Sequence, residues 1–290
     1  MIAEVPKGSS QREISEWNGQ GRITESDLIA EETPVALIYN GISHAVMMAS
    51  PIDLEAFAFG FSLSEGIIDH PDQIYSVEIR TVKLGIEVMI SLSSRQFDQL
   101  KKRRRTLAGQ SGCGLCGTES LEQIHQTLSV SSPQGLRISH DVIHLATHQL
   151  TDHQPLQQGT GAVHGAAWCS LEGQIIDICE DVGRHNALDK LIGKRAIKVS
   201  ALQEPGFLLM SSRASFEIVQ KAAMADIAVI VTISGPSSLA VDLAAQAGIT
   251  LIGFSRPARH VVYTHPFRVV SESSSQDIAG DETPRQTPHS

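Results

Sequence analysis

Two cysteines with the spacing Cys-x-x-Cys, Cys113 and Cys116, lie in the glycine-rich stretch LAGQSGCGLCGTES at residues 107–120. Glycine permits backbone conformations with positive φ and leaves little side-chain bulk over the sulfur atoms, so the sequence predicts an accessible loop. A basic run, Lys101 to Arg105, directly precedes this loop. Nearby positive charge and free backbone N–H groups lower the pKa of a thiol, and the thiolate is the form that attacks sulfur or binds metal.

Three kinds of chemistry fit this pair, and the residues alone leave them open. A structural zinc site needs four ligands, but the other two cysteines, Cys169 and Cys179, lie in apolar runs typical of strands. A thioredoxin-type dithiol begins a helix early in a small βαβ domain, whereas this pair comes late and follows a basic run. A persulfide carrier, in which one cysteine holds a transferable sulfur atom, suits the open loop best. An inert pair or a disulfide is the remaining reading.

The composition favours an intracellular protein with reduced thiols. The chain has 290 residues, of which 41% are hydrophobic, and a formal net charge of -9. This is enough for a full core and for two domains. No apolar run reaches the roughly 18 residues of a membrane span, and the first 21 residues are too polar for a secretory signal, so we expect a cytoplasmic location without membrane contact. The net acidity argues against nucleic acid as a partner.

The periodicity predicts an arm and then an α+β domain. Residues 1–24 have few apolar residues and no period, which predicts a flexible arm. Residues 25–150 are expected to form an N-terminal α+β domain that presents the cysteine loop. Its expected elements are a hairpin around Asn40-Gly41, a helix capped by Ser50, a strand pair at 74–92, a helix from Ser94 into the basic run, and helices at 121–128 and from Ser139.

Residues 151–270 alternate continuous apolar strands with helices, which predicts a C-terminal α/β domain with a mostly parallel sheet covered on both faces. The expected strands lie at 162–170, 174–179, 207–211, 228–233 and 249–254, and the expected helices at 186–192, 215–225 and 237–247. Residues 271–290 are rich in Ser, Asp, Glu and Pro and are expected to be a disordered tail.

Polar side chains follow four of these predicted strands. Because ligands of open α/β sheets bind at the carboxyl ends of the strands, we expect these residues to share one edge. Their arginines, hydroxyls and helix N-termini suit an anionic ligand with phosphate groups. The set comprises Glu180, Asp181, Gly183, Arg184, His185, Ser211, Ser212, Arg213, Ser215, Ser234, Gly235, Pro236, Ser237, Ser238, Ser255, Arg256, Pro257, Ala258, Arg259 and His260.

Several of these residues, and the basic run before the cysteines, also have an ordinary structural explanation. Ser215 and Ser237 are in positions where serine commonly caps a helix. Asp181 and Arg184 could pair with each other at the surface. The run from Lys101 to Arg105 is a solvated helix end or else a site for an anion or a partner.

His164, in the segment TGAVHGAA, invites comparison with the zinc deaminases. Those enzymes carry His-x-Glu followed by Pro-Cys-x-x-Cys, and the glutamate moves protons. In this chain Ala166 stands where the glutamate would be, and no later cysteine pair follows. Deaminase chemistry is therefore excluded at His164, while a shared fold stays open.

Eight segments together resemble the formate dehydrogenase accessory sulfurtransferase family (FdhD/NarQ). They are PVALIYNGISHAVMMA from Pro34, FSLSEGII from Phe61, SGCGLCG from Ser111, EDVGRHNALDKLIG from Glu180, SSRASFEIVQKA from Ser211, SLAVDLA from Ser238, LIGFSRPAR from Leu251 and VYTHP from Val262. They follow one another in the family's order and register from about Glu31 to Arg268. Ala162, where relatives often have Gly or Cys, and Gly165, where they often have Ala, are departures, and both stay small.

The resemblance implies a fold, an activity and a set of site residues. It implies a cytidine-deaminase-like, three-layer C-terminal domain and a carrier that takes sulfur from a cysteine desulfurase. The sulfur is delivered to the molybdenum cofactor in its bis(molybdopterin guanine dinucleotide) form, which formate dehydrogenase needs, and GDP would mimic that substrate. Cys113 falls on the persulfide cysteine and Cys116 on its companion. The implied cofactor-binding residues, with the candidates of the sheet edge, are Phe254, Ser255, Arg256, Pro257, Ala258, Arg259, Arg213, Arg184 and His164.

Two further expectations complete this interpretation. We expect a homodimer and no metal ion held by the protein itself. A function of another class also fits the residues: a non-catalytic chaperone that holds the cofactor for formate dehydrogenase, with the two cysteines of the loop playing no part in sulfur transfer.

Overall fold

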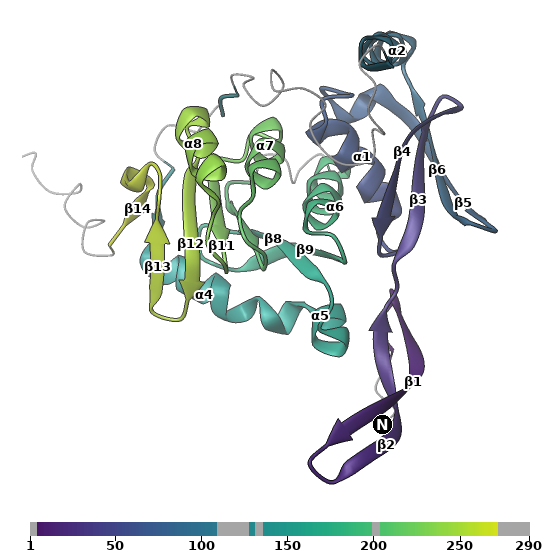
Figure 1. The fold of residues 1–290 in the computed structure, drawn as a ribbon. Coiled ribbons are helices and arrows are strands. Elements are labelled where there is room, and N and C mark those ends of the chain that lie inside the picture. The colour runs from purple at the N-terminus through teal and green to yellow at the C-terminus, as the bar shows by residue number, and fades with distance from the viewer. Residues whose placement is uncertain (1–4, 109–127, 131–135, 199–203, 272–290) are drawn as a thin grey trace, which may run out of the picture.

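The computed structural model describes residues 5–108, 128–130, 136–198 and 204–271 (Figure 1). Cys113 and Cys116, residues 121–127 of the helix expected after them, and the tail from residue 272 lie outside the described residues. Two sheets dominate the rest of the chain, a four-stranded sheet in the N-terminal part and a six-stranded sheet in the C-terminal part. Among the described residues, no helix combines the length and the apolar character needed to cross a bilayer.

The N-terminal unit is built on the four-stranded sheet, in the order β4-β3-β6-β5. Its strands are β3 (Thr33–Tyr39), β4 (Ile42–Ala49), β5 (Ile74–Val82, after the short turn η1, Pro71–Gln73) and β6 (Gly85–Leu92), and helix α1 (Leu54–Ser64) packs on one face. The predicted hairpin is confirmed. Asn40 and Gly41 both have positive φ, 45° and 82°, as the tight turn between β3 and β4 requires.

Helix α1 begins later than the sequence predicted, because its expected cap, Ser50, is used elsewhere. The Ser50 N–H donates to the Asp181 carboxylate at 3.0 Å, and the Ser50 hydroxyl accepts from the Val182 N–H at 3.2 Å. Asp53, with a φ of 52°, precedes the first helical residue instead. The helix predicted to run into the basic segment is present as α2 (Ser94–Ala108).

Most of the expected arm has regular structure, which the sequence did not predict. β1 (Ser9–Asn18) and β2 (Gly21–Ala30) pair as an antiparallel hairpin that projects from the body (Figure 1). Solvent reaches both faces of this hairpin, and Trp17 near its tip is 76% exposed. Without a buried face the strands need no alternation of apolar and polar residues, so the usual signal of a strand is missing from the sequence.

The C-terminal unit is built on the six-stranded sheet, in the order β13-β12-β11-β10-β8-β9. Its strands are β8 (His164–Cys169), β9 (Ile175–Asp181), β10 (Phe207–Met210), β11 (Val229–Thr232), β12 (Thr250–Arg256) and β13 (Arg259–Val262). Only β10, β11 and β12 pair in parallel, so the sheet is mixed rather than mostly parallel. Because β8 is antiparallel to both β9 and β10, the four strands β9 to β12 still run in one direction.

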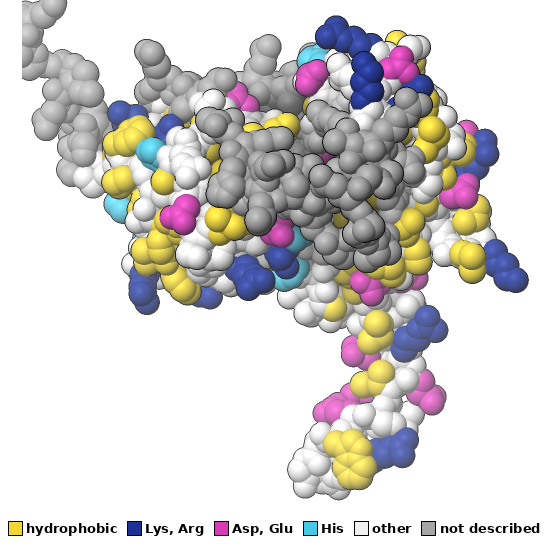
Figure 2. Space-filling model, turned by 45° about the horizontal axis from the view of Figure 1, so that its top comes forward, with side chains coloured by type: hydrophobic (Ala, Val, Ile, Leu, Met, Phe, Trp, Pro, Cys, Tyr) yellow, Lys and Arg dark blue, Asp and Glu magenta, His cyan; other side chains and the backbone are white. Residues whose placement is uncertain are grey.

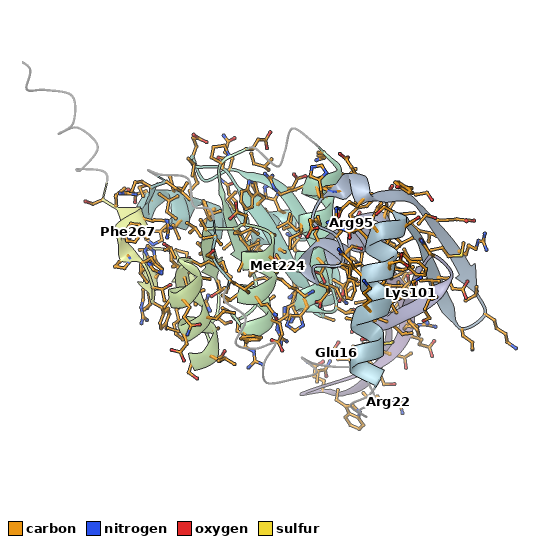
Figure 3. The ribbon with its side chains drawn as sticks, turned by 90° about the horizontal axis from the view of Figure 1, so that it is seen from above. Glu16, Arg22, Arg95, Lys101, Met224 and Phe267 are labelled. Carbon is orange, nitrogen blue, oxygen red and sulfur yellow. The ribbon has the colours of Figure 1, made fainter. Side chains whose placement is uncertain are left out.

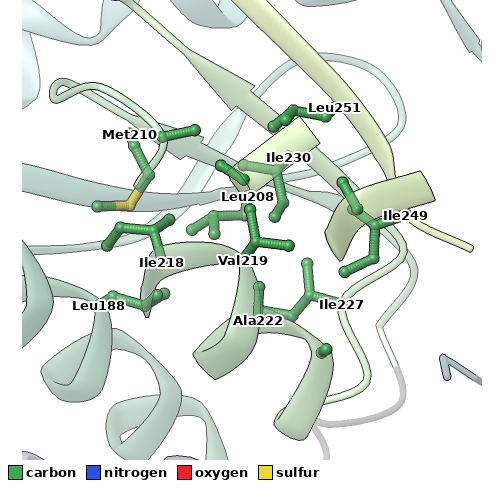
Figure 4. Packing of buried hydrophobic residues seen from close by; sticks show 14 of the residues in the cluster. Leu188, Leu208, Met210, Ile218, Val219, Ala222, Ile227, Ile230, Ile249 and Leu251 are labelled. Carbon is green, nitrogen blue, oxygen red and sulfur yellow. The ribbon is translucent and has the colours of Figure 1, made fainter. Parts of the chain in front are cut away.

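Helices cover both faces of this sheet, which confirms the predicted α/β class with three layers. On one face lie α6 (Arg184–Ile197), α7 (Phe216–Met224) and α8 (Ser238–Ala247), whose apolar side chains interlock with Leu208 and Ile230 of the sheet (Figure 4). On the other face lies α4 (His140–Gln149), through Ile143 and Ala146. Smaller elements are β7 (Ile138–Ser139), η2 (Thr151–His153), α5 (Pro155–Thr160), η4 (Pro266–Arg268) and β14 (Val269–Val270).

The packing divides the chain at a different point from the predicted boundary at residue 150. Leu136, Ile138 and α4 pack against the six-stranded sheet, and β7 pairs with β14 near the end of the described chain. Residues 136–150 therefore belong to the C-terminal unit. They form its outer layer because the second face of the sheet would otherwise expose its apolar side chains to water.

The two units meet where α1 crosses α6, backbone against backbone. A Cβ atom on Gly60 would lie 1.6 Å from the Asp189 carbonyl oxygen, and one on Gly193 would lie 1.8 Å from the Ala56 carbonyl oxygen. Such distances exclude any side chain, so glycine is required at both positions. This close crossing makes the N-terminal unit and the six-stranded sheet one packed body.

Candidate functional site

The predicted gathering of polar residues is confirmed at one edge of the six-stranded sheet, where β9 to β12 end and β8 begins. We call it the carboxyl edge. Hydrogen bonds from backbone N–H groups connect its loops: the Gly165 N–H donates to the Ser211 hydroxyl at 2.8 Å, and the Phe254 N–H donates to the Ser234 carbonyl at 3.3 Å. The Ser234 N–H in turn donates to the Ser212 carbonyl at 3.4 Å. The loops therefore form one connected surface.

The segment from Phe254 to Arg259 forms the outer part of this edge. Phe254 has a φ of 51° and is 45% exposed, and its ring lies so close over Gly235 that a Cβ atom there would be 2.5 Å from the ring. Arg256 donates from Nη1 to the carbonyls of Ile233 and Ser255, at 2.6 and 2.9 Å, and stays exposed. Arg259, its register partner across β12 and β13, is exposed as well.

Ser255 is the exception within this segment. Its side chain is fully buried, and its hydroxyl forms a 2.6 Å hydrogen bond with the hydroxyl of Thr147 in α4. Phe254 and Arg256 on either side are exposed while Ser255 faces the core, at a point where the pairing of β12 with β13 is irregular. The Ser255 side chain is therefore not placed to contact a ligand at the carboxyl edge, and only its backbone remains available.

His164 and Arg184 lie beside each other at the β8–β9 side of the carboxyl edge. His164 begins β8 and is the register partner of Asp181, and Arg184 begins α6. Burial, and then the charge of Arg184, lowers the pKa of His164, so the imidazole is neutral at pH 7. The Arg184 Nε is buried and has no hydrogen-bond partner among the described residues. Arg213, the third candidate, is exposed on the loop after β10.

His185 lies at this edge, as the sequence predicted, although it is not among the implied cofactor-binding residues. Its Nε2 lies 3.3 Å from the Ser215 hydroxyl and 3.6 Å from a carboxylate oxygen of Glu217. Burial and the neighbouring Arg184 lower its pKa to about 4, although Glu217 acts in the opposite direction. His185 adds a neutral imidazole that can accept or donate a hydrogen bond at the edge.

Other charged residues of the segment EDVGRHNALDK make contacts inside the protein. The alternative explanation of a surface pair between Asp181 and Arg184 does not hold, because Asp181 is fully buried and pairs with Lys190, also fully buried, at 2.6 Å. Lys190 donates as well to the Ser50 carbonyl at 2.9 Å. The Glu180 carboxylate accepts from two N–H groups at the start of α5, at 3.0 and 2.8 Å.

A second buried ion pair joins three helices. Lys221 of α7 contacts the Asp189 carboxylate of α6 at 3.0 Å and Glu65, just after α1, at 2.6 Å. The Ser64 hydroxyl donates to Asp189 at 2.6 Å. Burial outweighs these partners and raises the pKa of Asp189 to about 6. Contacts inside the protein thus account for four charged residues of the motif: Glu180, Asp181, Asp189 and Lys190.

The two described cysteines are not placed to act as thiolates. Cys169 packs in the layer on the α4 side of the sheet, whereas Cys179 packs among α6 and α7, so the two sulfur atoms face opposite layers. Burial raises the pKa of both thiols, that of Cys179 to about 12. They cannot complete one four-cysteine zinc site, and at neutral pH they stay protonated.

Three imidazoles form a hydrogen-bonded row at the start of β13. His140 Nδ1 lies 2.8 Å from His260 Nε2, and His260 Nδ1 lies 3.1 Å from His144 Nε2. His260 presents a different nitrogen to each neighbour, and no His, Cys, Asp or Glu group in the described part of the chain is arranged to hold a metal ion. Burial, with His140 and His144, lowers the pKa of His260 to about 4. These two hydrogen bonds connect β13 to α4.

Replacing His260 by glutamine is expected to make the fold less sensitive to acid. The folded pKa of His260 is about 4 against an ordinary 6.5. Between these values the unfolded chain binds more protons, so stability falls as the pH drops through this window. We expect the loss of Tm between about pH 7 and pH 5 to be a few degrees smaller in the variant. The raised pKa of Asp189 makes stability change with pH in the opposite direction, but this contribution is the same in the wild type and the variant. An equal loss of Tm in both would contradict the expectation.

Comparisons with known proteins match almost the whole chain. The model of the FdhD/NarQ family matches residues 30–270. The chain is 50% identical over 272 residues to the sulfur carrier protein FdhD of Cupriavidus necator, covering 94% of this chain and 93% of that protein. It is 52% identical over 238 residues to the protein of the same name from Acinetobacter baylyi, covering 82% and 86%.

A solved structure extends the similarity to the fold. The crystal structure of a protein described as a formate dehydrogenase accessory protein, from Desulfotalea psychrophila, superposes with a TM-score of 0.71. It is 25% identical in sequence and covers 90% of this chain and 99% of that one. The two-unit architecture is therefore shared with a protein of much lower sequence identity.

Proposed function

The chain belongs to the FdhD/NarQ family, and from this premise we propose that it is a sulfur carrier for formate dehydrogenase that takes sulfur from a cysteine desulfurase and delivers it to the molybdenum bis(molybdopterin guanine dinucleotide) cofactor. One observation carries the proposal: two relatives that are 50% and 52% identical over most of the chain are named sulfur carrier proteins. The cofactor is the substrate of this reaction.

The carrier cysteine is Cys113. The chain has four cysteines, and two of them, Cys169 and Cys179, are buried with raised thiol pKa values. The remaining two lie in the glycine-rich sequence after a basic helix, a setting that favours a thiolate. The resemblance assigns the persulfide to the first of these, Cys113, and a supporting role to the second, Cys116.

The loading step is a thiolate exchange on sulfur. The Cys113 thiolate attacks the outer sulfur of the persulfide on the desulfurase, a new S–S bond forms, and the thiolate of the desulfurase leaves. The proton stays on the transferred sulfur, so no external oxidant or reductant is needed. Cys116 can discharge the carrier. Its thiolate attacks the inner sulfur of the Cys113 persulfide, hydrosulfide leaves, and a Cys113–Cys116 disulfide remains.

The carboxyl edge is the proposed site of the guanine dinucleotide. Arg256, Arg259 and Arg213 are exposed there and can donate charge-assisted hydrogen bonds to phosphate oxygens. The exposed ring of Phe254 lies close over Gly235 and offers an apolar surface to a guanine base. Arg184 with its unpartnered Nε, and the neutral His164 beside it, are further candidates for polar contacts.

Replacing both Arg256 and Arg259 by alanine is expected to weaken GDP binding by about 10- to 100-fold, since each lost charge-assisted hydrogen bond costs about 1.5–3 kcal/mol before solvent screening. Isothermal titration calorimetry measures the effect. The control replaces Arg80 and Lys83, two exposed cations of the N-terminal unit, and should bind GDP normally. Persulfide loading should be unchanged in both variants. Wild-type affinity in the Arg256 and Arg259 variant would remove this edge from the proposal.

The alternative of a non-catalytic chaperone makes a different prediction about sulfur. A chaperone would bind the cofactor and formate dehydrogenase, yet it would carry no label after incubation with desulfurase and radiolabelled cysteine. The carrier acquires the label and passes it to formate dehydrogenase that lacks sulfur. A homodimer and a cytoplasmic location stay part of the proposal, and a molecular mass from light scattering together with cell fractionation tests them.

A further inference from the structure

Helix α2 is strongly basic in an acidic protein. It carries six basic residues and one acidic residue, Asp98, whereas the whole chain has a net charge of -9. The basic residues are Arg95, Lys101, Lys102, Arg103, Arg104 and Arg105. Cations near the end of a helix favour its dipole, but that effect is confined to the last turn and leaves Arg95 and Lys102 unexplained.

One side of α2 packs on the N-terminal unit, and the other side faces water. Gln96 and Leu100 are buried, while Arg95 and Lys102, one heptad apart on the same side, are exposed. Lys101 pairs with Asp98, the one acidic residue of the helix, at 2.7 Å. In Figure 2 the dark-blue side chains gather over α2, and Figure 3 shows Arg95 and Lys101 along the helix as it lies nearest the viewer. We call this exposed side the basic face.

The basic face is not part of the carboxyl edge. In Figure 1, α2 lies at the top of the molecule, whereas the turn between β12 and β13, which holds Pro257 and Ala258, lies at the bottom. Phosphate groups of a dinucleotide held at that turn would therefore be out of reach of α2. The positive charge of α2 calls for a different partner.

The sequence connects the basic face to Cys113. The basic run ends at Arg105, eight residues before this cysteine, and α2 ends at Ala108. Eight residues span at most about 30 Å when fully extended. A protein that hands sulfur to Cys113 must bring its own persulfide into covalent contact with it, so the surface of that protein comes within reach of α2.

Resting on the proposed function, we propose that the basic face docks the sulfur-donating protein through an acidic surface next to the donor's persulfide cysteine. Complementary charge across such an interface steers diffusional encounter and fixes the orientation of the two proteins. The carrier as a whole is acidic and would repel an acidic donor. The basic face supplies the local attraction that brings the correct side of the carrier to the donor.

A charge-neutralised variant tests this docking. It carries Arg95→Gln, Lys101→Gln, Lys102→Gln and Arg105→Gln, the four cations whose helical spacing places them away from buried Gln96 and Leu100. Glutamine keeps the helix propensity of lysine and arginine. The matched control removes four exposed cations elsewhere, by Arg12→Gln, Arg22→Gln, Arg80→Gln and Lys83→Gln. Both variants have the same net charge. The rate of sulfur loading is measured with a limiting amount of a purified cysteine desulfurase that loads the wild type, and separately with inorganic polysulfide, which needs no docking.

We expect the α2 variant to load from the desulfurase about 10- to 100-fold more slowly than the control at low ionic strength. The difference should shrink at about 0.5 M salt, because screening removes the attraction. Loading from polysulfide should be equal in all three proteins.

Equal desulfurase rates in the α2 variant and the control would overturn the docking proposal. Slow loading from polysulfide as well would also overturn it, since the cations would then act on the thiol itself. If normal loading is combined with poor delivery to formate dehydrogenase, the basic face serves the acceptor and not the donor. A wild type that gains no sulfur from either source would instead contradict the proposed function.

Discussion

Replacing Cys113 by alanine is expected to abolish sulfur loading and to leave GDP binding intact. The variant lacks the thiolate that attacks the donor persulfide, and the two buried cysteines cannot take its place because their pKa values are raised and the protein covers them. Incorporation of radiolabelled sulfur from cysteine and desulfurase should fall to background. GDP affinity should match that of the wild type, because the carboxyl edge is untouched.

Two further variants make this result specific. Cys169→Ala removes a fully buried thiol and should load sulfur at the wild-type rate. Cys116→Ala should load sulfur and hold it longer, since the attack that releases hydrosulfide is lost. If the Cys113 variant accepts labelled sulfur at the normal rate, the carrier cysteine has been assigned wrongly.

Replacing Lys190 by methionine is expected to cost about 3–5 kcal/mol of unfolding free energy, the usual effect of removing one partner of a buried ion pair. The Asp181 carboxylate would lose the ammonium group at 2.6 Å and would remain buried. It would keep the N–H groups of Ser50 and Gly183, at 3.0 and 2.7 Å, which limit the cost but do not neutralise the charge. Because Ser50 belongs to the N-terminal unit, the loss falls on the joint between the two units.

The matched control is Lys198→Met. Lys198 pairs with Asp177 at 2.8 Å, but its side chain is 54% exposed, so its removal should cost at most about 1 kcal/mol. Urea unfolding followed by circular dichroism gives both values. Equal midpoints for the two variants would mean that the buried pair contributes no more to stability than an exposed one.

The elements of regular structure were largely predictable, because most have one buried face. The hairpin at Asn40-Gly41 follows from turn chemistry, and the alternation of apolar strands with helices gave the α/β class. The carboxyl edge could be predicted even though the sheet is mixed, since the argument needs only that β9 to β12 share a direction. The hairpin β1–β2 could not, because neither of its faces packs against a core.

Burial at the candidate site could not be predicted for two residues, for the same physical reason. Asp181 and Arg184 are close in sequence and could pair at the surface, yet Ser50 from the other unit covers Asp181 and Lys190 neutralises it. Ser255 lies within the proposed binding segment, but its side chain faces the core and its hydroxyl bonds to Thr147, so only its backbone is available to a ligand. A sequence identifies chemistry along the chain, whereas burial depends on which distant segment packs over a residue.

The most direct test of sulfur transfer by this chain is mass spectrometry of tryptic peptides after incubation with desulfurase and cysteine, without a reductant. The sequence favours this experiment, since residues 106–137 form one tryptic peptide with Cys113 and Cys116, and residues 138–184 form the next with Cys169 and Cys179. We expect one added sulfur mass on the first peptide, located on Cys113 by fragmentation, and none on the second. No added sulfur on the first peptide, or added sulfur on the second alone, would contradict the account.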